Sequence, residues 1–550
     1  MKFFVPILLL VAFLRFFQLT STPDGLYWDE LDTGYQSYSL LHTARDYYGN
    51  LFPAHLQSFA DFRSSLYMYL TVPSVRLFGL NPFSVRLPAV LISLLTLPVI
   101  YWLSRKFLRL PPNIAWVAVA VWGFAPWTLV QGRIAAESMT FPLFLLLGFA
   151  LFQKFLSTGK SLSLSAAFFA LGLWTYPTAK LFLPVFLIIL AIAYYRRIRQ
   201  LFFIRTIFVP VLVFMIITAP VISESLFKNV NRRFSELSIT TDPVISSEVN
   251  YRRLESALGG GTKRQIGMQP GLLERLIINK FTYIFEQFLS NYSRSLSGQF
   301  LFFSGDPQLR HNLNLPNTGQ FYLLEFIPFM IGISLLIRPD QPDRSRRFLL
   351  VSWLILSPVA ASLTRDGGTH APRLLPLLPP VVFIISLGLN QILNHKYFRT
   401  LYLGTYLISV ILTYFYFFNT YRVTSSFSFN SGYLPAVASV INSGNSYDRI
   451  ILDGHKESFL MAYLFTTRYN PALFQSSFPL PSGQVSPGVE GYKFGNFYIL
   501  YPGSRDWTKI KPGGKNLVIT AYDQPNASVI KPDRIFTNPD GSPALYEFSL

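Results

Sequence analysis

Long apolar runs recur along most of the chain, and short polar segments that carry basic residues separate them. Runs of this length suit helices that cross about 30 Å of hydrocarbon. The first run, Phe3 to Leu19, is followed by the bulky Leu26-Tyr27-Trp28 and by no small-residue cleavage site, so we expect it to stay as the first membrane helix. The pattern predicts an α-helical polytopic membrane protein with about eleven or more transmembrane helices.

The basic residues between the runs predict the orientation of the chain in the membrane. They form five clusters: Arg105/Lys106/Arg109, Lys154/Lys160, Arg196/Arg197/Arg199/Arg205, Arg338/Arg344/Arg346/Arg347 and Lys396/Arg399. An even number of runs lies between neighbouring clusters, as it must if all five are cytoplasmic. We therefore expect a multi-pass protein of the cell membrane with a cytoplasmic N-terminus and an outer C-terminal segment.

Four loops are expected on the outer face: 20–65, 131–138, 223–320 and 364–373. From Leu272 to Leu289 the third loop becomes apolar at helical spacing, which predicts a helix along the membrane surface. After about Tyr421 the composition is that of a soluble domain. Short β-type runs follow there: Arg449–Leu452, Asn496–Tyr501, Asn516–Tyr522 and Ala544–Phe548. The sequence predicts a membrane domain over 1–420 and a small extracytoplasmic α/β domain over 421–550.

The composition supports the prediction of a membrane protein and excludes several classes of function. Hydrophobic residues make up 51% of the chain and charged residues 14%, whereas soluble domains carry about a quarter charged residues. The net charge of +19 comes mainly from the loops between apolar runs, so membrane orientation explains it and no nucleic acid is expected as a partner. The absence of cysteine excludes disulfides, thiolate nucleophiles and zinc–thiolate sites.

The first candidate for chemistry is the acidic pair Asp29-Glu30, directly after the first run and Trp28. Adjacent side chains point in different directions, so one carboxylate can face a reaction cavity while the other orients the following helix. The alternative is an acidic helix start that the helix dipole favours. The dipeptide alone leaves both interpretations open.

Glu137 is the second acidic candidate, because it is the only acidic residue between Asp61 and Glu224 and lies in a short outer loop. A carboxylate so close to hydrocarbon is costly unless it is paired or used. The alternative is a local ion pair with Arg133, four residues earlier on a helix.

A third group of candidates is cationic and lies in outer loops. Arg373 and His370 flank Ala371-Pro372 and follow a flexible Gly367-Gly368 pair. A guanidinium and an imidazole in this setting can hold a phosphate; the alternative is an anchor for the next span. The remaining members of the group are Lys180, Arg310 and His311.

Carboxylates and cations on one outer face suit transfer of a sugar from a lipid phosphate. A carboxylate base removes the proton of an acceptor hydroxyl as the hydroxyl attacks the anomeric carbon, and cations stabilise the departing phosphate. The expected partners are a polyprenyl-phosphate-linked sugar, membrane lipids, and a protein, lipid or glycan acceptor.

At these residues the chain resembles the GT-C superfamily of membrane glycosyltransferases. It is most similar to the bacterial branch related to protein O-mannosyltransferases and aminoarabinose transferases (glycosyltransferase family 39-like), from Met1 to about Tyr421. The motifs are Asp29-Glu30, Ser84-Val85-Arg86-Leu87-Pro88, Arg133 with Glu137, Phe302-Phe303-Ser304-Gly305-Asp306 with Arg310-His311, and Ser362-Leu363-Thr364 with His370 and Arg373.

The resemblance implies a GT-C fold and a hexosyl- or pentosyltransferase that inverts the anomeric configuration. By this resemblance, Asp29 is expected to be the catalytic base and Glu137 an assisting acid or metal ligand. Glu30 is expected to belong to the same catalytic group. Arg373 and His370 best match the cations that bind the carrier phosphate, and Arg133 belongs to the same donor-binding set. No cofactor is required by this interpretation; Asp29 and Glu137 either share a divalent metal or work without one.

Two features depart from the family pattern, and both affect the acceptor more than the donor. Where the family has a His-Pro-Pro-Leu stretch ahead of the second span, this chain reads Phe62-Arg63-Ser64-Ser65-Leu66-Tyr67, and the outer domain after Tyr421 resembles no known catalytic module. The alternatives are a polymerase or ligase of lipid-linked oligosaccharides and a flippase or transporter of lipid-linked sugars. A transporter is disfavoured because the sequence shows neither repeated halves nor a set of mid-span carboxylates.

Overall fold

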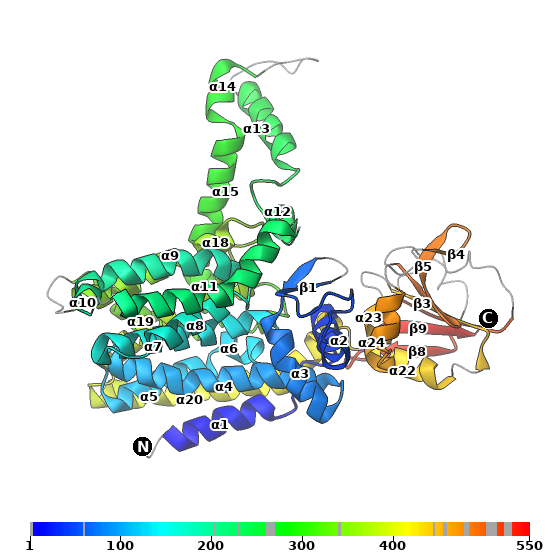
Figure 1. Ribbon diagram of the computed structural model, residues 1–550, viewed down its shortest axis with the longest axis horizontal. Coiled ribbons are helices and arrows are strands. Elements are labelled where there is room, and N and C mark those ends of the chain that lie inside the picture. The colour runs from blue at the N-terminus through cyan, green and yellow to red at the C-terminus, as the bar shows by residue number, and fades with distance from the viewer. Residues whose placement is uncertain are drawn as a thin grey trace. The chain divides into compact units, whose positions relative to one another are not determined.

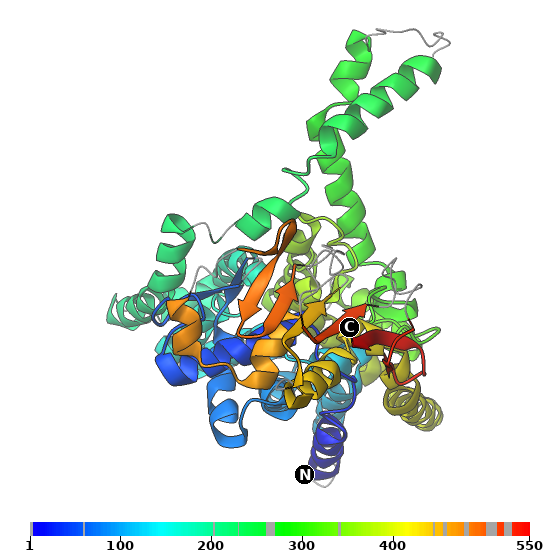
Figure 2. The same cartoon turned by 90° about the vertical axis from the view of Figure 1, so that its right-hand side faces the viewer.

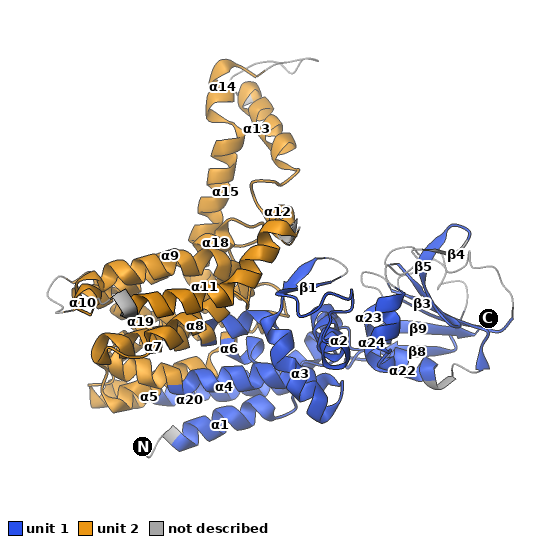
Figure 3. Cartoon of the chain, viewed as in Figure 1, with its two compact units in different colours: residues 1–98, 128–143, 403–550 blue, residues 99–127, 144–402 orange. Residues whose placement is uncertain are grey.

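The computed structural model describes residues 4–58, 61–201, 204–228, 230, 232–259, 270–338, 343–443, 446–454, 459–477, 483–501, 514–521 and 531–549. Phe3 and Tyr522, which bound two of the predicted runs, lie outside these ranges. The chain forms two compact units (Figure 3). Unit 1 comprises residues 1–98, 128–143 and 403–550, and unit 2 comprises residues 99–127 and 144–402. The predicted domain division near Tyr421 stays a prediction.

Apolar α-helices dominate the structure, as the hydrophobic pattern predicts (Figure 1). Among the described residues, five helices are long and apolar enough to cross a membrane: Pro82–Lys106, Glu137–Thr158, Ile207–Phe227, Ala371–Ile392 and Lys396–Thr424. Five shorter apolar helices accompany them: Val5–Phe16, Pro112–Phe124, Leu162–Gly172, Pro177–Ala193 and Leu323–Ile337. The chain is therefore a multi-pass membrane protein, and the count of about eleven spans stays a prediction.

The regular elements of unit 2 in the described residues are all helices, joined by loops. Its elements are α5 (Pro112–Phe124), α7 (Thr140–Thr158), α8 (Leu162–Gly172), α9 (Pro177–Ala193), α10 (Tyr195–Gln200), α11 (Ile204–Phe227), α12 (Arg232–Leu237), α13 (Ile245–Gly259), α14 (Leu272–Ile277), α15 (Lys280–Ser295), η3 (Gln299–Phe303), η4 (Leu323–Glu325), α16 (Phe326–Ile337), α17 (Arg344–Leu356), α18 (Val359–Ser362), η5 (Ala371–Leu377) and α19 (Leu378–Ile392). Helix α19 packs against α5 and α16, and its buried side chains form much of the core of this unit.

The apolar stretch Ile114–Val130, long enough for one membrane span, forms parts of two helices. Helix α5 ends at Phe124, and α6 (Pro126–Gln131) begins two residues later. Ala125 between them is extended, with φ −55° and ψ 135°. A residue before proline is disfavoured in the helical region because the ring clashes with its backbone, so Pro126 explains the break.

Helices α13, α14 and α15 form an arm that projects from the other helices of unit 2 in both views (Figures 1 and 2), and the C-terminal part of α15 contacts α18. The helix predicted over Leu272–Leu289 is interrupted, because Asn279 accepts from the Phe281 and Thr282 backbone N–H groups and starts α15. Exposed apolar side chains gather on this arm, including Leu272, Leu273, Leu276, Ile277, Phe281 and Phe285. Their exposure agrees with the predicted contact with a membrane surface, which stays a prediction.

Unit 1 combines helices with two sheets. Its helical elements are α1 (Phe4–Phe16), α2 (Trp28–Thr43), α3 (Leu66–Phe78), η1 (Glu137–Met139), η6 (Phe417–Tyr421), α21 (Arg422–Thr424), η7 (Ser426–Phe429), α22 (Tyr433–Ser443), α23 (Leu460–Thr467) and α24 (Pro471–Ser476), with the larger parts of α4 (Pro82–Lys106), α6 and α20 (Lys396–Tyr416). Strands β1 (His55–Gln57) and β2 (Phe62–Ser64) pair as an antiparallel hairpin in the first predicted outer loop.

The C-terminal part of unit 1 holds a seven-stranded sheet of order β4-β5-β6-β3-β7-β9-β8. The strands are β3 (Arg449–Asp453), β4 (Gly483–Ser486), β5 (Val489–Phe494), β6 (Phe497–Leu500), β7 (Asn516–Ala521), β8 (Arg534–Thr537) and β9 (Pro543–Ser549). Central strand β3 runs parallel to β6 and β7, and the other pairs are antiparallel. The four runs predicted from the sequence are β3, β6, β7 and β9.

The C-terminal region contacts helix α2, which carries the acidic pair of the first outer loop. The Tyr35 hydroxyl donates to the Tyr469 carbonyl oxygen at 3.1 Å. The Gln475 amide donates to the hydroxyls of Ser39 and Thr43 at 3.0 and 2.9 Å. The C-terminal helices therefore support α2 within one compact unit.

Gly34 allows α2 to pack closely against Phe465 of α23 and Val85 of α4, because glycine has no side chain. A Cβ there would lie 2.5 Å from Cε2 of Phe465 and 2.9 Å from Cγ2 of Val85. We expect Gly34→Ala to lower the melting temperature of the detergent-solubilised protein, since overpacking costs about 1–3 kcal/mol and exceeds the gain of about 1 kcal/mol in helix propensity. Gly404→Ala is the control, because a Cβ at Gly404 would have no atom within 4 Å; equal effects of the two variants would contradict the packing argument.

Candidate active site

Asp29 and Glu30 lie in the first turn of α2, and their carboxylates occupy different environments. The Asp29 side chain is 39% exposed, whereas Glu30 is fully buried. This divergence is what adjacent positions on a helix require. Only one of the two carboxylates is therefore accessible to a substrate.

Glu30 is enclosed by Arg86 of α4 and by the loop after α6. Arg86 donates through Nε and Nη2 to the two carboxylate oxygens at 2.8 and 2.9 Å, and the Ala135 N–H donates to Oε1 at 2.9 Å. Arg86 also donates to the carbonyl oxygens of Leu19, Pro23 and Gly25. This buried ion pair fixes the start of α2 to the segment that precedes it.

Arg63 is the centre of the acidic cluster around Asp29. The β1–β2 hairpin holds this buried side chain, whose Nη1 lies 3.0 Å from Oδ2 of Asp32 and 3.8 Å from Oδ1 of Asp29. Its Nε lies 3.8 Å from Oε1 of Glu137. Burial lowers the pKa of Arg63, but Asp29, Glu137 and Asp32 outweigh this effect and raise it above its ordinary value. One guanidinium thus gathers three carboxylates from separate parts of the sequence.

Asp32 is fully buried and lies on α2, one turn after Asp29. The Tyr47 hydroxyl donates to its Oδ1 at 2.7 Å, and Arg63 donates to its Oδ2 at 3.0 Å. Burial raises the pKa of Asp32 above its ordinary value, against the opposing effects of Arg63 and Tyr47. Its hydrogen bonds indicate that Asp32 orients Arg63.

Arg133 does not form the local helical pair with Glu137 that the sequence offered as an alternative. The segment between them is not helical, because α6 ends at Gln131 and η1 begins at Glu137. The guanidinium of Arg133 instead donates to four backbone carbonyl oxygens at the end of α1 and just after it, those of Leu14, Arg15, Phe17 and Thr22. Arg133 therefore satisfies carbonyl groups that the helix end leaves unpaired.

In unit 2, the loop that carries Arg373 and His370 is held tightly. Asn291 of α15 donates to the carbonyl oxygens of Ser362 and Thr364, and Ser295 donates to that of Gly368. The Gly367-Gly368 pair, predicted to be flexible, is closely packed. A Cβ at Gly367 would lie 1.9 Å from the Ala361 carbonyl oxygen, and one at Gly368 would lie 2.9 Å from Cα of Asn291. The glycines permit close backbone packing and do not form a hinge.

Arg373 is half-buried at the start of η5. Its Nη1 donates to the Thr364 hydroxyl at 2.8 Å and to the Arg365 carbonyl oxygen at 2.9 Å. Arg365 itself lies 3.7 Å from the Asp242 carboxylate. The loop thus fixes the position of the Arg373 guanidinium through its own backbone.

His370 and His311 lie together with Asp306. Nδ1 of His311 is 2.8 Å from Oδ2 of Asp306, and the two imidazole rings are 4.6 Å apart. Among the described residues, these three form the one group of histidines and carboxylates close enough to hold a metal ion, with one ligand atom of each within 4.8 Å of the others. Of the other predicted cations, Lys180 lies in the first turn of α9 and Arg310 directly precedes His311.

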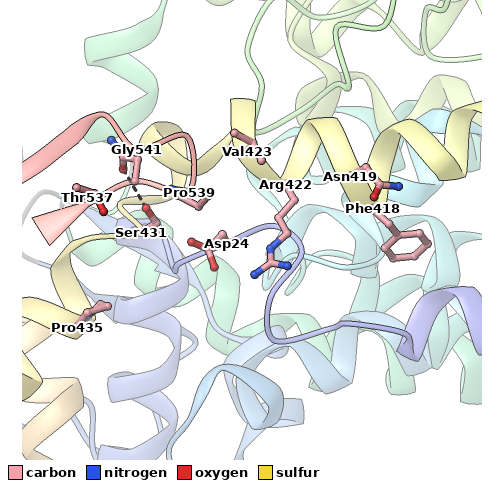
Figure 4. A pocket seen from close by; sticks show the side chains of 11 residues that line it. Asp24, Phe418, Asn419, Arg422, Val423, Ser431, Pro435, Thr537, Pro539 and Gly541 are labelled. Carbon is pink, nitrogen blue, oxygen red and sulfur yellow. Dashed lines mark hydrogen bonds between the residues drawn. The ribbon is translucent and has the colours of Figure 1, made fainter.

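A cavity of about 740 Å³ lies elsewhere in unit 1 (Figure 4). Its lining comprises Asp24, Phe418, Asn419, Arg422, Val423, Ser431, Pro435, Thr537, Asn538, Pro539 and Gly541. The lining includes none of the predicted catalytic or phosphate-binding residues. Burial raises the pKa of Asp24, and the charges of Arg422 and Arg86 oppose this shift.

Arg63 and Asp32 belong to the acidic cluster but were not selected as site residues from the sequence. Arg63 appeared only within the segment that departs from the His-Pro-Pro-Leu pattern. Its position offered a signal, since a basic residue in a predicted outer loop goes against the usual cytoplasmic bias and needs a local partner.

The comparisons with known proteins agree with this architecture. Residues 64–223 match the family model described as dolichyl-phosphate-mannose-protein mannosyltransferase. No curated protein sequence matches the chain. The crystal structure of ArnT from Cupriavidus metallidurans bound to undecaprenyl phosphate is similar, with a TM-score of 0.51 and 13% identity over 99% of this chain and 98% of that one.

Two structures from Archaeoglobus fulgidus also resemble the chain. The oligosaccharyltransferase AglB in complex with an inhibitory peptide and a dolichol-phosphate has a TM-score of 0.47 and 11% identity, over 94% of this chain and 70% of that one. The oligosaccharyltransferase tethered with an acceptor peptide has a TM-score of 0.47 and 10% identity, over 84% and 63% of the two chains.

The predicted resemblance to GT-C membrane glycosyltransferases is confirmed by the family model and by the likeness to ArnT. The predicted fold class is confirmed as well: the chain is a mostly helical membrane protein of GT-C fold with a small C-terminal sheet region. These findings support the coarser functional prediction, a membrane glycosyltransferase.

Proposed function

We propose that this chain of GT-C fold transfers a sugar from a polyprenyl-phosphate carrier to an acceptor hydroxyl on the outer face of the membrane. The observation that carries the proposal is the contrast among the carboxylates of α2. Glu30 and Asp32 are buried and engaged with arginines, whereas Asp29 is partly exposed beside Arg63. The undecaprenyl phosphate bound in the ArnT structure supports a carrier of this class.

Asp29 is the proposed base. It removes the proton of the acceptor hydroxyl while the hydroxyl oxygen attacks the anomeric carbon, and the bond from that carbon to the carrier phosphate breaks. One displacement of this kind inverts the anomeric configuration. The charge of Arg63, 3.8 Å away, compensates the Asp29 carboxylate before it accepts the proton. Glu137, whose Oε1 lies 3.8 Å from Nε of Arg63, is the proposed assisting acid.

The identity of the donor can be tested in cells that lack the protein. Mass spectrometry of lipid-linked sugars is expected to show accumulation of one polyprenyl-phosphate sugar and loss of one glycan modification, both reversed by the wild-type gene. Accumulation of a lipid-linked oligosaccharide would favour the polymerase or ligase alternative. An unchanged set of lipid-linked sugars and glycans would contradict the proposal.

Arg373 is the proposed ligand of the carrier phosphate in unit 2. We expect Arg373→Ala to raise the KM for the lipid donor by about 10-fold or more while changing the KM for the acceptor little, because charge-assisted bonds to a phosphate are strong. Arg373→Lys is expected to recover part of the donor affinity. Equal increases in both KM values would assign Arg373 a structural role through Thr364 and Arg365.

The outer location of both sets of residues can be tested by labelling, since the chain contains no cysteine. Single cysteines at the exposed positions Leu51 and Asp366 are expected to react with a membrane-impermeant maleimide in intact cells. A cysteine at the exposed Lys160, in a predicted cytoplasmic loop, is expected to react only after permeabilisation. Protection of Leu51→Cys or Asp366→Cys in intact cells would contradict the proposed sidedness.

A further inference from the structure

Asp306, His311 and His370 form a preorganised cluster that the proposed transfer reaction does not use. Gly305, which directly precedes Asp306, adopts a positive φ of +73°. A Cβ on Gly305 would lie 2.6 Å from Nδ2 of Asn312, so a larger residue would not fit at this turn. The Asp306 side chain is buried. Its Oδ1 accepts from the Gln308 N–H at 2.9 Å, and its Oδ2 accepts from the Ala371 N–H at 2.8 Å. The carboxylate is therefore fixed before any ligand arrives.

The two imidazoles complete a set of one oxygen and two nitrogen ligands. Nδ1 of His311 lies 2.8 Å from Oδ2 of Asp306. The centroids of the His311 and His370 rings are 4.6 Å apart. One ligand atom from each of the three residues lies within 4.8 Å of the others. A tetrahedrally coordinated ion at about 2.0–2.2 Å from each ligand atom would fit after a small movement of the three side chains toward one another.

We propose that these three residues bind a divalent transition-metal ion, with Zn²⁺ as the preferred ion. Two imidazoles and one carboxylate are typical zinc ligands, and they leave a fourth position open. Mg²⁺ and Ca²⁺ prefer all-oxygen sites, so the two imidazoles disfavour them. The ion would replace the contact between Nδ1 of His311 and Oδ2 of Asp306, and its charge would compensate the buried carboxylate.

The ion would join two segments that are distant in the sequence. Asp306 and His311 follow η3, whereas His370 directly precedes η5 and lies three residues before Arg373. One hydrogen bond, from the Ala371 N–H to Asp306, already joins the two segments. A bound metal adds a coordinate link at the same point and so restrains the loop that carries Arg373. In this assignment His370 is a metal ligand, in place of the direct phosphate contact predicted from the sequence.

The test uses the purified full-length protein in nanodiscs, stripped with a chelator and then titrated with Zn²⁺. We expect one Zn²⁺ per chain by elemental analysis after desalting, and a visible d–d spectrum when Co²⁺ replaces it. Asp306→Asn, His311→Ala and His370→Ala are each expected to weaken Zn²⁺ binding by at least about 100-fold, the upper end of the loss for outer-shell partners. His42→Ala and His395→Ala, two histidines outside the cluster, are expected to bind Zn²⁺ as the wild type does.

X-ray absorption of Zn²⁺ on the wild-type protein tests the ligand set without any variant, so misfolding of a mutant cannot obscure the result. Two imidazoles and one carboxylate in the first shell would support the proposal. A first shell without histidine, no stoichiometric binding at micromolar Zn²⁺, or full binding by the His311→Ala/His370→Ala double variant would overturn it. These experiments measure only metal binding, so their outcome does not depend on whether the protein catalyses the transfer reaction.

Discussion

The Asp29→Asn variant is expected to lose transfer by about 10²–10⁴-fold, the range that general base catalysis contributes. Asparagine keeps the size and the hydrogen-bonding shape of the side chain but cannot accept the hydroxyl proton. Because Asp29 is 39% exposed, the variant should fold and insert into the membrane normally. The measurement is restoration of the lost glycan in cells that lack the wild-type protein, with the melting temperature of the purified variant recorded in parallel.

The control for this variant is Glu490→Gln, which removes an exposed carboxylate from β5 in the same unit. It is expected to restore the glycan fully. Full restoration by Asp29→Asn as well would remove Asp29 as the base. A large fall in melting temperature of Asp29→Asn would instead indicate that the carboxylate is structural.

Arg86→Met is expected to destabilise the protein more than any other substitution considered. It leaves Glu30 as a buried charge without its ion pair, which costs about 3–5 kcal/mol, and it removes the donor to the carbonyl oxygens of Leu19, Pro23 and Gly25. Thermal unfolding followed by size-exclusion chromatography measures the effect. The double variant Glu30→Gln/Arg86→Met is expected to recover part of the loss, because no isolated charge remains.

Lys228→Met provides the matched control for the ion pair. Lys228 pairs with Glu224 at 2.9 Å, but its side chain is 44% exposed. Exposed pairs of this kind contribute about 0–1 kcal/mol. A loss as small for Arg86→Met as for Lys228→Met would contradict the assigned role of the buried pair.

The long apolar helices and four strands of the C-terminal sheet, β3, β6, β7 and β9, could be predicted from the sequence, because burial in a membrane or in a sheet imposes a repeating apolar pattern. Strands β4, β5 and β8 were not predicted, and β4 and β8 are the two edge strands of the seven-stranded sheet. Edge strands have one partner strand only, so their sequences carry a weaker apolar signal. The break at Pro126 was also missed, although proline is a direct local signal for it.

The acidic pair was predictable because charges are rare in this chain and Asp29-Glu30 directly follows an apolar run. That the two carboxylates point in different directions was predicted as well, but their partners were not, since Arg86 lies 56 residues away from Glu30 and Arg63 lies in a separate hairpin. The tight packing of Gly367 and Gly368 was not predictable either. It depends on contacts with α15 and α18, and glycine appears in flexible and in closely packed backbone alike.

The most direct test of the transfer mechanism is the consumption of a polyprenyl-phosphate sugar by purified protein, with lipid and protein extracts of the same membrane as acceptors. We expect the wild type to release polyprenyl phosphate and to form a product of inverted anomeric configuration, while Asp29→Asn leaves the donor intact. Release at equal rates by both proteins, or a product that retains the configuration of the donor, would contradict this mechanism.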